Sequence, residues 1–464
     1  MSQVGNARHI NLRESNASQI DEAGTTQDLG ALIDGARVSG VQLGLVMLAA
    51  LAIILDGFDG QLIGFAIPSL IKEWGVTKAD FAPVIAIGLL GMAFGSVMAG
   101  VIGDRLGRKT ALLISIALFG VTTTLIGFSG NLSTLAILRF IAGLGIGGCL
   151  PTATTIAGEF VSRRHRAMLI TVTIACFPAG GIFAGIFSNY VLPSYGWRGL
   201  FEIGGLVPVV FALLLVVFLP ESPRFLARHP ARHGELARLL ARFGIAAKPG
   251  TRFVDASDDG RSAATETRDD VGFRALLAPV RRRNTIGLWI AFFGCFFAIY
   301  SAFSWLPTMM AGEGFSPAIS GGALTAYNIG GVIGALLCAR GIGAFGSRGP
   351  MVLAGIGGIA SALILKVVPN DQPWLFVAGF GLHGFMVNAV ACTLYALSAT
   401  IYPTGARATG IAVGLAFSRV GAILSAFVGA AVITALGAQG YLTSLGVALV
   451  IVTLGLAVVK NQKA

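Results

Sequence analysis

The sequence has little charge and few cysteines, and both shortages narrow the class of protein. Only 12% of the 464 residues are charged, about half the share found in soluble domains. Together with a 55% share of hydrophobic residues, this excludes an ordinary soluble enzyme and a disordered protein. The five cysteines form no Cys-x-x-Cys pair and are odd in number, which excludes a disulfide scaffold. We expect them to pack as small apolar side chains.

The apolar residues are gathered in long runs between Val41 and Val459. Many of these runs exceed the roughly 20 residues that an α-helix needs to cross a bilayer. No segment shows the alternation of apolar and polar residues that is typical of a transmembrane β-strand. The sequence therefore predicts an all-α integral membrane protein. We predict twelve spans, near residues 41–70, 81–102, 110–129, 134–157, 168–192, 199–219, 284–310, 318–339, 350–368, 374–400, 407–433 and 438–459.

The basic residues follow the predicted topology. With both termini in the cytoplasm, 27 of the 33 Lys and Arg residues lie in the tails and inner loops, and four lie in outer loops. This is the positive-inside distribution. The net charge of +11 is therefore explained by topology and not by nucleic-acid binding, with anionic membrane lipid as a secondary partner. Residues 1–40 lack the layout of a secretory signal, and we expect them to form a mobile cytoplasmic tail.

The chain divides into two parts of similar plan. We predict an N-terminal six-helix half at residues 41–219 and a C-terminal six-helix half at residues 284–459, with a charged cytoplasmic loop at 220–283 between them and a short tail at 460–464. Short sequence matches at an offset of 241 residues relate the fifth span to the eleventh. Two similar membrane halves that face each other are typical of transporters, in which substrate binds between the halves and is exposed to one side at a time.

The first span carries two acids, Asp56 and Asp59, inside an apolar run. Charges within the bilayer are costly, so each one is a candidate functional residue. A spacing of three places both carboxyl groups on neighbouring faces of the helix. Two acids in an apolar site raise each other's affinity for protons, and such a pair titrates as one unit. This favours proton coupling; the alternative is that one acid forms a structural ion pair with an arginine.

Two arginines also lie within predicted spans, one in each half: Arg139 in the fourth and Arg419 in the eleventh. The planar guanidinium group stays charged and suits a carboxylate. The pattern therefore indicates an anionic substrate, with Arg419 favoured as its ligand and Arg139 as a ligand or a structural partner. A competing interpretation pairs the two arginines with Asp56 and Asp59 as a neutral set, and both arrangements can coexist.

Aromatic and polar residues of the second half complete the candidate site. The seventh span is rich in rings, including Phe296 and Tyr300. A wall of rings suits a planar ligand, although aromatic stripes in membrane helices more often contact lipid or neighbouring helices. His383 is the only histidine in a span, and it suits either proton transfer or a structural role. The further polar candidates for substrate binding are Tyr327, Asn328, His383 and Asn388.

A charged loop from Gly100 to Lys109 joins the second and third spans. Its residues Asp104, Arg105 and Arg108 lie at the inner membrane surface, where charge pairing can stabilise one conformation of a transport cycle. The alternative is that the basic residues only anchor the topology. The pattern of glycines followed by Asp-Arg-x-Gly-Arg-Lys resembles the signature loop of the major facilitator superfamily.

Within that superfamily the chain resembles the aromatic acid/proton symporters. The resemblance implies a major facilitator fold and proton-driven uptake of benzoate-like or hydroxylated aromatic acids. It also implies that Asp56 and Asp59 are critical for transport and that Asp104, Arg407 and Arg419 serve gating or binding. The supporting motifs are Asp-Gly-x-Asp at Asp56 and Asp59, Arg139-Phe140 with the glycine-rich run to Pro151, Gly196-Trp197-Arg198, Leu219-Pro220-Glu221-Ser222, Tyr402-Pro403-Thr404, Arg407-Ala408-Thr409-Gly410 and Arg419.

The sequence thus predicts a multi-pass importer of an aromatic carboxylate in the cytoplasmic membrane, driven by protons and functional as a monomer. The nearest alternative is a proton symporter of the same fold for another organic anion or a sugar. A drug efflux pump is a second alternative, but Arg419 would repel a cationic drug. The sequence holds no nucleophile triad, metal-ligand cluster or nucleotide-binding loop. We therefore expect neither enzymatic activity nor a cofactor.

Overall fold

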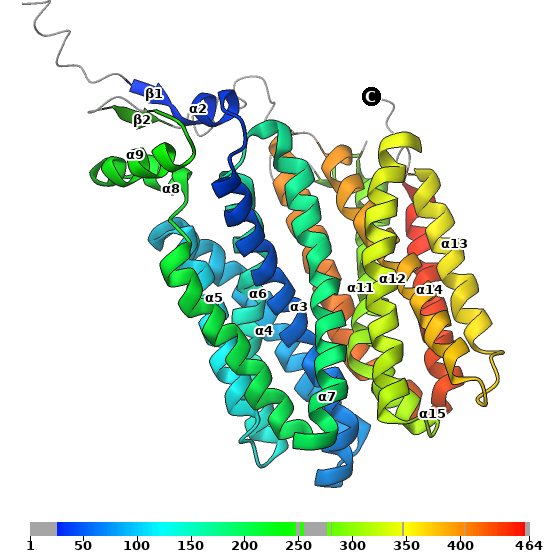
Figure 1. The fold of residues 1–464 in the computed structure, drawn as a ribbon. Helices are drawn as coiled ribbons and strands as arrows, with labels where there is room; N and C mark the ends of the chain where they lie inside the picture. The colour runs from blue at the N-terminus through cyan, green and yellow to red at the C-terminus, as the bar shows by residue number, and fades with distance from the viewer. Residues whose placement is uncertain are drawn as a thin grey trace, which may run out of the picture.

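The computed structural model describes residues 26–246, 251–254, 276–279, 281–345, 348–402 and 404–459, apart from a few side chains within helices. Long, nearly parallel helices form most of it (Figure 1). They are α3 (Gly40–Trp74), α4 (Lys78–Leu106), α5 (Arg108–Ile126), α6 (Leu132–Glu159), α7 (Arg163–Phe218), α11 (Arg282–Gly312), α12 (Pro317–Phe345), α13 (Arg348–Leu365), α14 (Pro373–Ile401) and α15 (Thr404–Val458).

Two of these helices are each a pair of helices joined at a kink. At 56 and 55 residues, α7 and α15 would be roughly 80 Å long if straight, well beyond the ~30 Å hydrocarbon core of a bilayer. Each contains one glycine with non-helical backbone angles and a positive φ, Gly196 in α7 and Gly437 in α15. Glycine is suited to such a position because it has no Cβ.

Among the described residues, nine helices are long and apolar enough to cross a membrane. They include α7 and α15, and α13 is a shorter apolar helix. With the breaks at Gly196 and Gly437, these elements accommodate the twelve predicted spans. The all-α membrane fold predicted from the apolar runs is confirmed.

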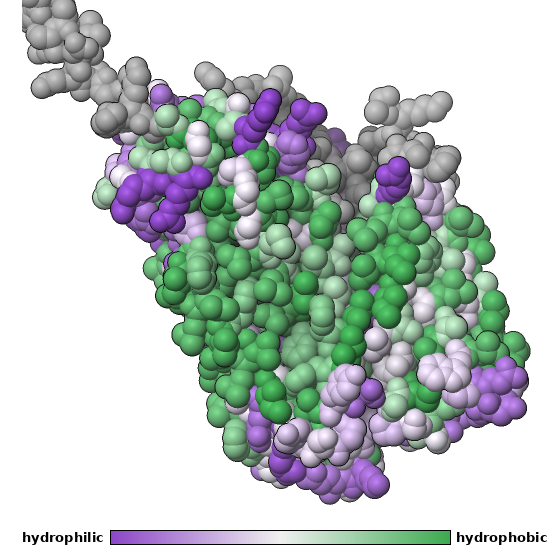
Figure 2. All heavy atoms as spheres, in the orientation of Figure 1, coloured by the Kyte–Doolittle hydropathy of each residue, from purple (hydrophilic) through white to green (hydrophobic). Residues whose placement is uncertain are grey.

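The surface of the helical part suits a bilayer. On the face shown in Figure 2, hydrophobic residues cover the middle of the molecule, and hydrophilic residues gather toward its two ends. Large apolar side chains such as Met47, Val97 and Leu213 are more than 60% exposed. A soluble protein does not expose apolar patches of this extent, so this surface is explained by contact with lipid.

The helices form two groups, which we call the first half (α3 to α7) and the second half (α11 to α15). The most extensive helix contacts lie within the groups, between α3 and α7, α4 and α6, α11 and α15, and α12 and α14. Contacts between the halves join α7 to α12, α4 to α15 and α3 to α11. Small residues permit close approach within each group: at Gly95 of α4, a Cβ would overlap the backbone of Leu144 in α6.

A small assembly lies beyond the end of the bundle at which α3 begins (Figure 1). Its strands β1 (Thr26–Asp28) and β2 (Arg252–Val254) pair in parallel. Its helices are α2 (Leu29–Gly35), α8 (Pro223–Ala227), the 3₁₀ helix η1 (Pro230–Arg232) and α9 (His233–Arg242).

The expectation of a mobile tail over residues 1–40 is therefore wrong for β1 and α2, and residues 1–25 lie outside the described part. Leu29 and Ile33 of α2 are buried, and Asp34 Oδ1 accepts a hydrogen bond of 2.7 Å from the backbone N–H of Arg163. These contacts fix the segment to the first half, because burying apolar side chains offsets the entropy lost on ordering it.

Candidate functional site

The two acids of α3 lie in the interior of the protein. Asp56 and Asp59 are 1% and 0% exposed. Oδ1 of Asp56 and both carboxyl oxygens of Asp59 form no hydrogen bond with any described residue. Leaving such groups without partners in an apolar medium costs several kcal/mol, so their surroundings must compensate the charge or allow protonation.

The structure brings one arginine toward each acid. Asp59 interacts electrostatically with Arg139 of α6, and Asp56 interacts with Arg419 of α15. Neither pair approaches within the 4 Å of a salt bridge among the described residues. The first pair lies within the first half, whereas the second joins the two halves. Of the two interpretations that the sequence leaves open, the neutral set of four charges would use these two acid–arginine pairs.

Thr123 of α5 is a residue that the sequence reasoning missed. It is fully buried and faces Asp59, although its hydroxyl does not reach hydrogen-bond geometry. A run of three threonines, Thr122 to Thr124, interrupts an otherwise apolar helix. That run is the only signal in the sequence, and Thr122 and Thr124 instead bond to carbonyl groups of their own helix.

Arg419 is held by an aromatic cluster of the second half. Its Nη1 donates a hydrogen bond of 3.0 Å to the hydroxyl of Tyr300 in α11. Phe296 stacks beside Tyr300, with ring centroids 6.4 Å apart, and also contacts Tyr395 of α14 edge-on. Farther along α11, Trp289 stacks on Phe417 at 4.7 Å. The aromatic stripe therefore packs mainly against α14 and α15, and its Tyr300 end orients the arginine.

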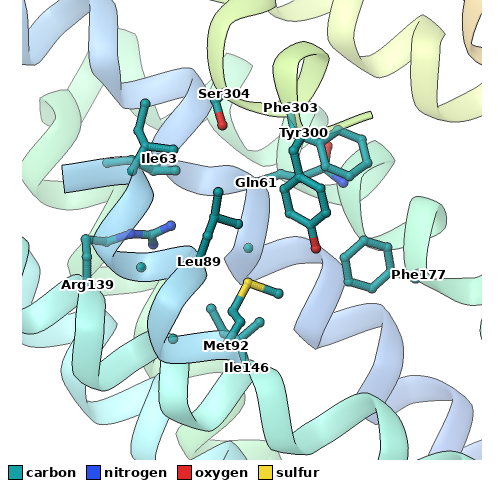
Figure 3. Close-up of a pocket in the computed structure, with 14 residues that line it drawn as sticks. Gln61, Ile63, Leu89, Met92, Arg139, Ile146, Phe177, Tyr300, Phe303 and Ser304 are labelled. Carbon is teal, nitrogen blue, oxygen red and sulfur yellow. The ribbon is translucent and has the colours of Figure 1, made fainter. Parts of the chain in front are cut away.

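A small cavity lies between the halves beside these groups (Figure 3). Figure 3 shows the Arg139 guanidinium group and the Tyr300 hydroxyl on its two sides, with Leu89 and Met92 between them. Its volume is about 30 Å³, well below the ~150 Å³ of a cavity that takes up benzene. A ring-sized ligand therefore requires the halves to move apart. The polar and aromatic residues of the lining are Gln61, Arg139, Phe177, Tyr300, Phe303 and Ser304.

The other polar candidates do not line this cavity. His383 is fully buried, and its Nδ1 lies 2.9 Å from the hydroxyl of Ser361 in α13. Tyr327 is buried between the rings of Phe303 and His383. Asn388 donates a hydrogen bond to a carbonyl of its own helix, and Asn328 bonds to Gln61. Phe296 likewise lies behind Tyr300, outside the lining.

The charged loop at the end of α4 forms a network within the first half. Arg108 Nη2 lies 2.9 Å from Asp104, and its Nε lies 3.5 Å from Glu159 at the end of α6. Glu159 also accepts a hydrogen bond from the Ser222 hydroxyl. Sequence reasoning missed Glu159, whose only signal is an acid at the end of a span. Arg105 is exposed.

Glu221, which follows the C-terminal end of α7, joins this network through Ser222. Its Oε1 accepts hydrogen bonds from the backbone N–H groups of Lys109 and Ser222, at 3.0 and 2.9 Å. It thereby caps the N-terminus of α5, which begins at Arg108, directly after Gly107 with its φ of 103°. A Cβ at Gly107 would overlap the Glu221 carboxyl group. Arg407 lies in α15, and its side chain is outside the described part.

Residues 49–371 and 288–463 match the Major Facilitator Superfamily. The chain belongs to this superfamily. It is 32% identical to the gallate transporter of Pseudomonas putida, over 88% of this chain and 89% of that protein. It is also 32% identical to the 4-hydroxybenzoate transporter of Acinetobacter baylyi, over 91% and 92%, and 29% identical to the benzoate transport protein of that organism, over 86% and 84%.

Solved structures agree on the fold. A crystal structure of a D-xylose-proton symporter covers 89% of this chain and 97% of its own, with a TM-score of 0.68 and 17% identity. The inward-open xylose transporter of E. coli gives a TM-score of 0.70, also at 17% identity, over 90% and 96%. The superfamily match and the transporter relatives together show that the protein is a multi-pass membrane transporter and not an enzyme, as the sequence predicts.

The Glu221 network gives a stability prediction. Glu221→Ala removes the acceptor of two backbone N–H groups in a buried setting, where Glu221 is 4% exposed. We expect a loss of about 1–3 kcal/mol and a lower apparent Tm of the detergent-solubilised protein, measured by loss of the monodisperse peak after heating. The matched control is Glu235→Ala, which breaks the exposed ion pair with Arg232 and is expected to cost less than about 1 kcal/mol. Equal shifts for both variants would contradict the capping role.

Proposed function

We propose that this transporter imports an aromatic carboxylic acid together with protons, by alternating exposure of a site between its two halves, residues 41–219 and 284–459. The relatives named for gallate, 4-hydroxybenzoate and benzoate support the substrate class. One observation supports particular residues for this function. Two buried acids each have an arginine near them, beside a cavity lined by both halves.

Asp56 and Arg419 are the proposed coupling pair. When Asp56 is ionised, its charge is compensated across the interface by Arg419. When Asp56 takes up a proton, Arg419 retains its charge and loses its counter-charge, so a substrate carboxylate can replace Asp56 as its partner. Proton binding and substrate binding then favour each other. Asp59 and Arg139 form the second acid–arginine set, within the first half.

The lining of the cavity suits the remainder of such a substrate. Tyr300, Phe303 and Phe177 present rings from both halves, and aromatic walls pack well on a planar ligand. Two arginines near the site favour an organic anion over a neutral sugar, which argues against the sugar alternative. The proton gradient supplies the driving force in this scheme, and no cofactor takes part.

The location follows from the charge distribution. We place the protein in the cytoplasmic membrane as a monomer, with both termini and the loop at 220–283 in the cytoplasm and anionic lipid at the basic surface. In this orientation the network of Asp104 and Arg108 lies at the inner surface. We assign to it, with the exposed Arg105 and with Arg407, the gating of the inner side.

Uptake of a labelled substrate tests the function. Cells that express the protein should accumulate radiolabelled 4-hydroxybenzoate, and a protonophore should abolish the accumulation because it removes the driving force. Unlabelled benzoate should compete, whereas xylose should not. Absence of uptake by protein verified in the membrane would contradict the aromatic substrate, and uptake that persists with the protonophore would contradict proton coupling.

Neutralising one acid tests the coupling. Asp56→Asn keeps the shape of the side chain but cannot exchange a proton, so accumulation against a gradient should fall to the level of cells without the protein. Exchange of internal for external substrate needs no net proton movement and should persist. The matched control is Asp371→Asn, which changes an exposed acid of a loop and should leave accumulation intact. Concentrative uptake by Asp56→Asn would contradict the proposed role.

Removing the arginine tests the carboxylate ligand. Arg419→Ala should raise the half-saturation concentration for uptake or exchange at least about tenfold, because hydrogen bonds to charged groups contribute roughly 1.5–3 kcal/mol. Arg419→Lys keeps the charge without the planar fork and should give an intermediate value. Arg340→Ala, at an exposed position of α12, is the control. An unchanged half-saturation concentration would show that Arg419 does not bind the substrate.

A further inference from the structure

A pair of amide side chains joins the two halves inside the bundle. The Nδ2 group of Asn328 in α12 donates to Oε1 of Gln61 in α3 at 2.8 Å, and Nε2 of Gln61 donates back to Oδ1 of Asn328 at 3.3 Å. Both residues are 0% exposed. A reciprocal pair of this kind uses the donor and acceptor of each amide at once. Neither side chain bears a charge, in contrast to the acids and arginines nearby.

The helices around this pair are in direct contact across the interface. At Gly64, one turn beyond Gln61, a Cβ would overlap the carbonyl group of Phe303 in α11. At Gly185 of α7, a Cβ would overlap the hydroxyl of Thr325 in α12. At Gly64 only a glycine allows the two backbones to come this close. The two halves therefore meet tightly next to the amide pair, where α3 approaches α11 and α7 approaches α12.

This contact lies on one side of the buried charges. Gln61, Gly64 and the contacts at Gly185 all fall beyond Asp59 in the direction of the Trp74 end of α3, away from the end that carries β1 and α2. Gln61 also lines the cavity beside Arg139 and Tyr300. The amide pair thus joins the two halves at the level of the cavity, whose lining also extends toward that end, to Ile63 and Ser304.

We propose that Gln61 and Asn328 form the latch of the outer gate, which must separate before substrate reaches the cavity from outside. The assignment to the outer side rests on the orientation given under the proposed function. An uncharged latch suits this place because it does not pair with Asp56 or Asp59, so only the transported proton changes the charge of these two acids. Its release exposes both amides to water that enters with the opening, so separation costs only the small net difference between the two sets of hydrogen bonds.

The latch replaces direct substrate binding as the role of Asn328. Loss of the latch and loss of an ordinary packing contact should also have different effects. A packing contact contributes to stability alone, whereas a latch shifts the balance between the closed and the open outer side. The shift can be measured without substrate, so its outcome is independent of whether the protein carries aromatic acids.

The test uses Ser304→Cys as a reporter of access to the cavity from outside. Ser304 lines the cavity and is 5% exposed. Right-side-out cells are treated with a membrane-impermeant thiol reagent, and the labelling of protein with an intact Ser304 gives the background from the native cysteines. Ile63→Cys, also in the lining, serves as a second reporter if the first variant does not insert.

Gln61→Ala and Asn328→Ala should each increase the labelling rate of the reporter by roughly tenfold, the factor that corresponds to about 1.4 kcal/mol of lost hydrogen bonding. The double variant should show about the same increase as either single one, because both remove one interaction. Gln42→Ala is the matched control. It deletes a buried amide of the same helix, whose bond to the carbonyl of Phe160 stays within the first half, and it should leave the rate unchanged.

Three results would overturn the proposal. The first is an unchanged labelling rate in both alanine variants. The second is an increase of equal size in Gln42→Ala, which would indicate general loosening of the bundle. The third is an increase seen only in inverted membrane vesicles, which would place the latch on the inner side. Loss of aromatic acid uptake in the wild-type protein would instead contradict the proposed function and leave these labelling results interpretable.

Discussion

The cost of burying charge in an apolar bundle constrains the whole interior of this transporter. Two acids and two arginines lie among helices that face lipid, and charge there is tolerated only when it is compensated or removed by a proton. The structure meets this condition by placing one arginine toward each acid. The two sets differ in where they lie: Asp59 and Arg139 both belong to the first half, whereas Asp56 and Arg419 face each other across the interface.

Because of this difference, the charge compensation of one pair is constant, whereas that of the other changes with the arrangement of the two halves. Compensation between Asp59 and Arg139 is independent of how the halves are oriented, because both residues move with the same group of helices. Compensation between Asp56 and Arg419 depends on the interface between the halves. A change in the ionisation of Asp56 therefore changes the energy of that interface, whereas the same change at Asp59 acts first on the interior of one half. The contacts between the halves at Gln61, Asn328 and Gly64 are neutral, so they do not compete with the arginines for the acids.

Much of this arrangement can be predicted from the sequence. The thickness of the bilayer sets the length of each apolar run, and a charge within such a run is visible in the local sequence. Spans were predicted from apolar runs alone, and the breaks within α7 and α15 fall between predicted spans, at Gly196 and Gly437. Asp56, Asp59, Arg139 and Arg419 stand out because each is a charge in an apolar run. The sequence does not indicate which acid faces which arginine, since that depends on how α3 packs against α6 and α11 and on where α15 lies across the interface.

Other features escape sequence reasoning for the same reason. Gln61 is an uncharged residue among many in the spans, and only the packing of α3 on α11 and of α7 on α12 brings it to Asn328. His383 stands out in the sequence as the only histidine in a predicted span, yet its neighbour is Ser361 in the interior of the second half. The aromatic stripe of α11 suits either a ligand wall or a packing face, and most of it packs against α14 and α15. The fold of residues 26–35 depends on strand β2 more than 200 residues away, a contact that no local pattern predicts.

The position of Tyr300 links these observations to the substrate. Its hydroxyl accepts a hydrogen bond from Arg419, and its ring lines the cavity. One residue therefore orients the cation and borders the space beside it. Arg419 itself is outside the cavity lining, so under the proposed function a ligand that joins a carboxylate directly to a planar ring would contact Arg419 through the carboxylate and Tyr300 through the ring. A flexible aliphatic acid satisfies only the charge. If Arg419 binds the carboxylate as proposed, its hydrogen bond to Tyr300 places an aromatic ring beside that carboxylate, which is the arrangement an aromatic acid requires.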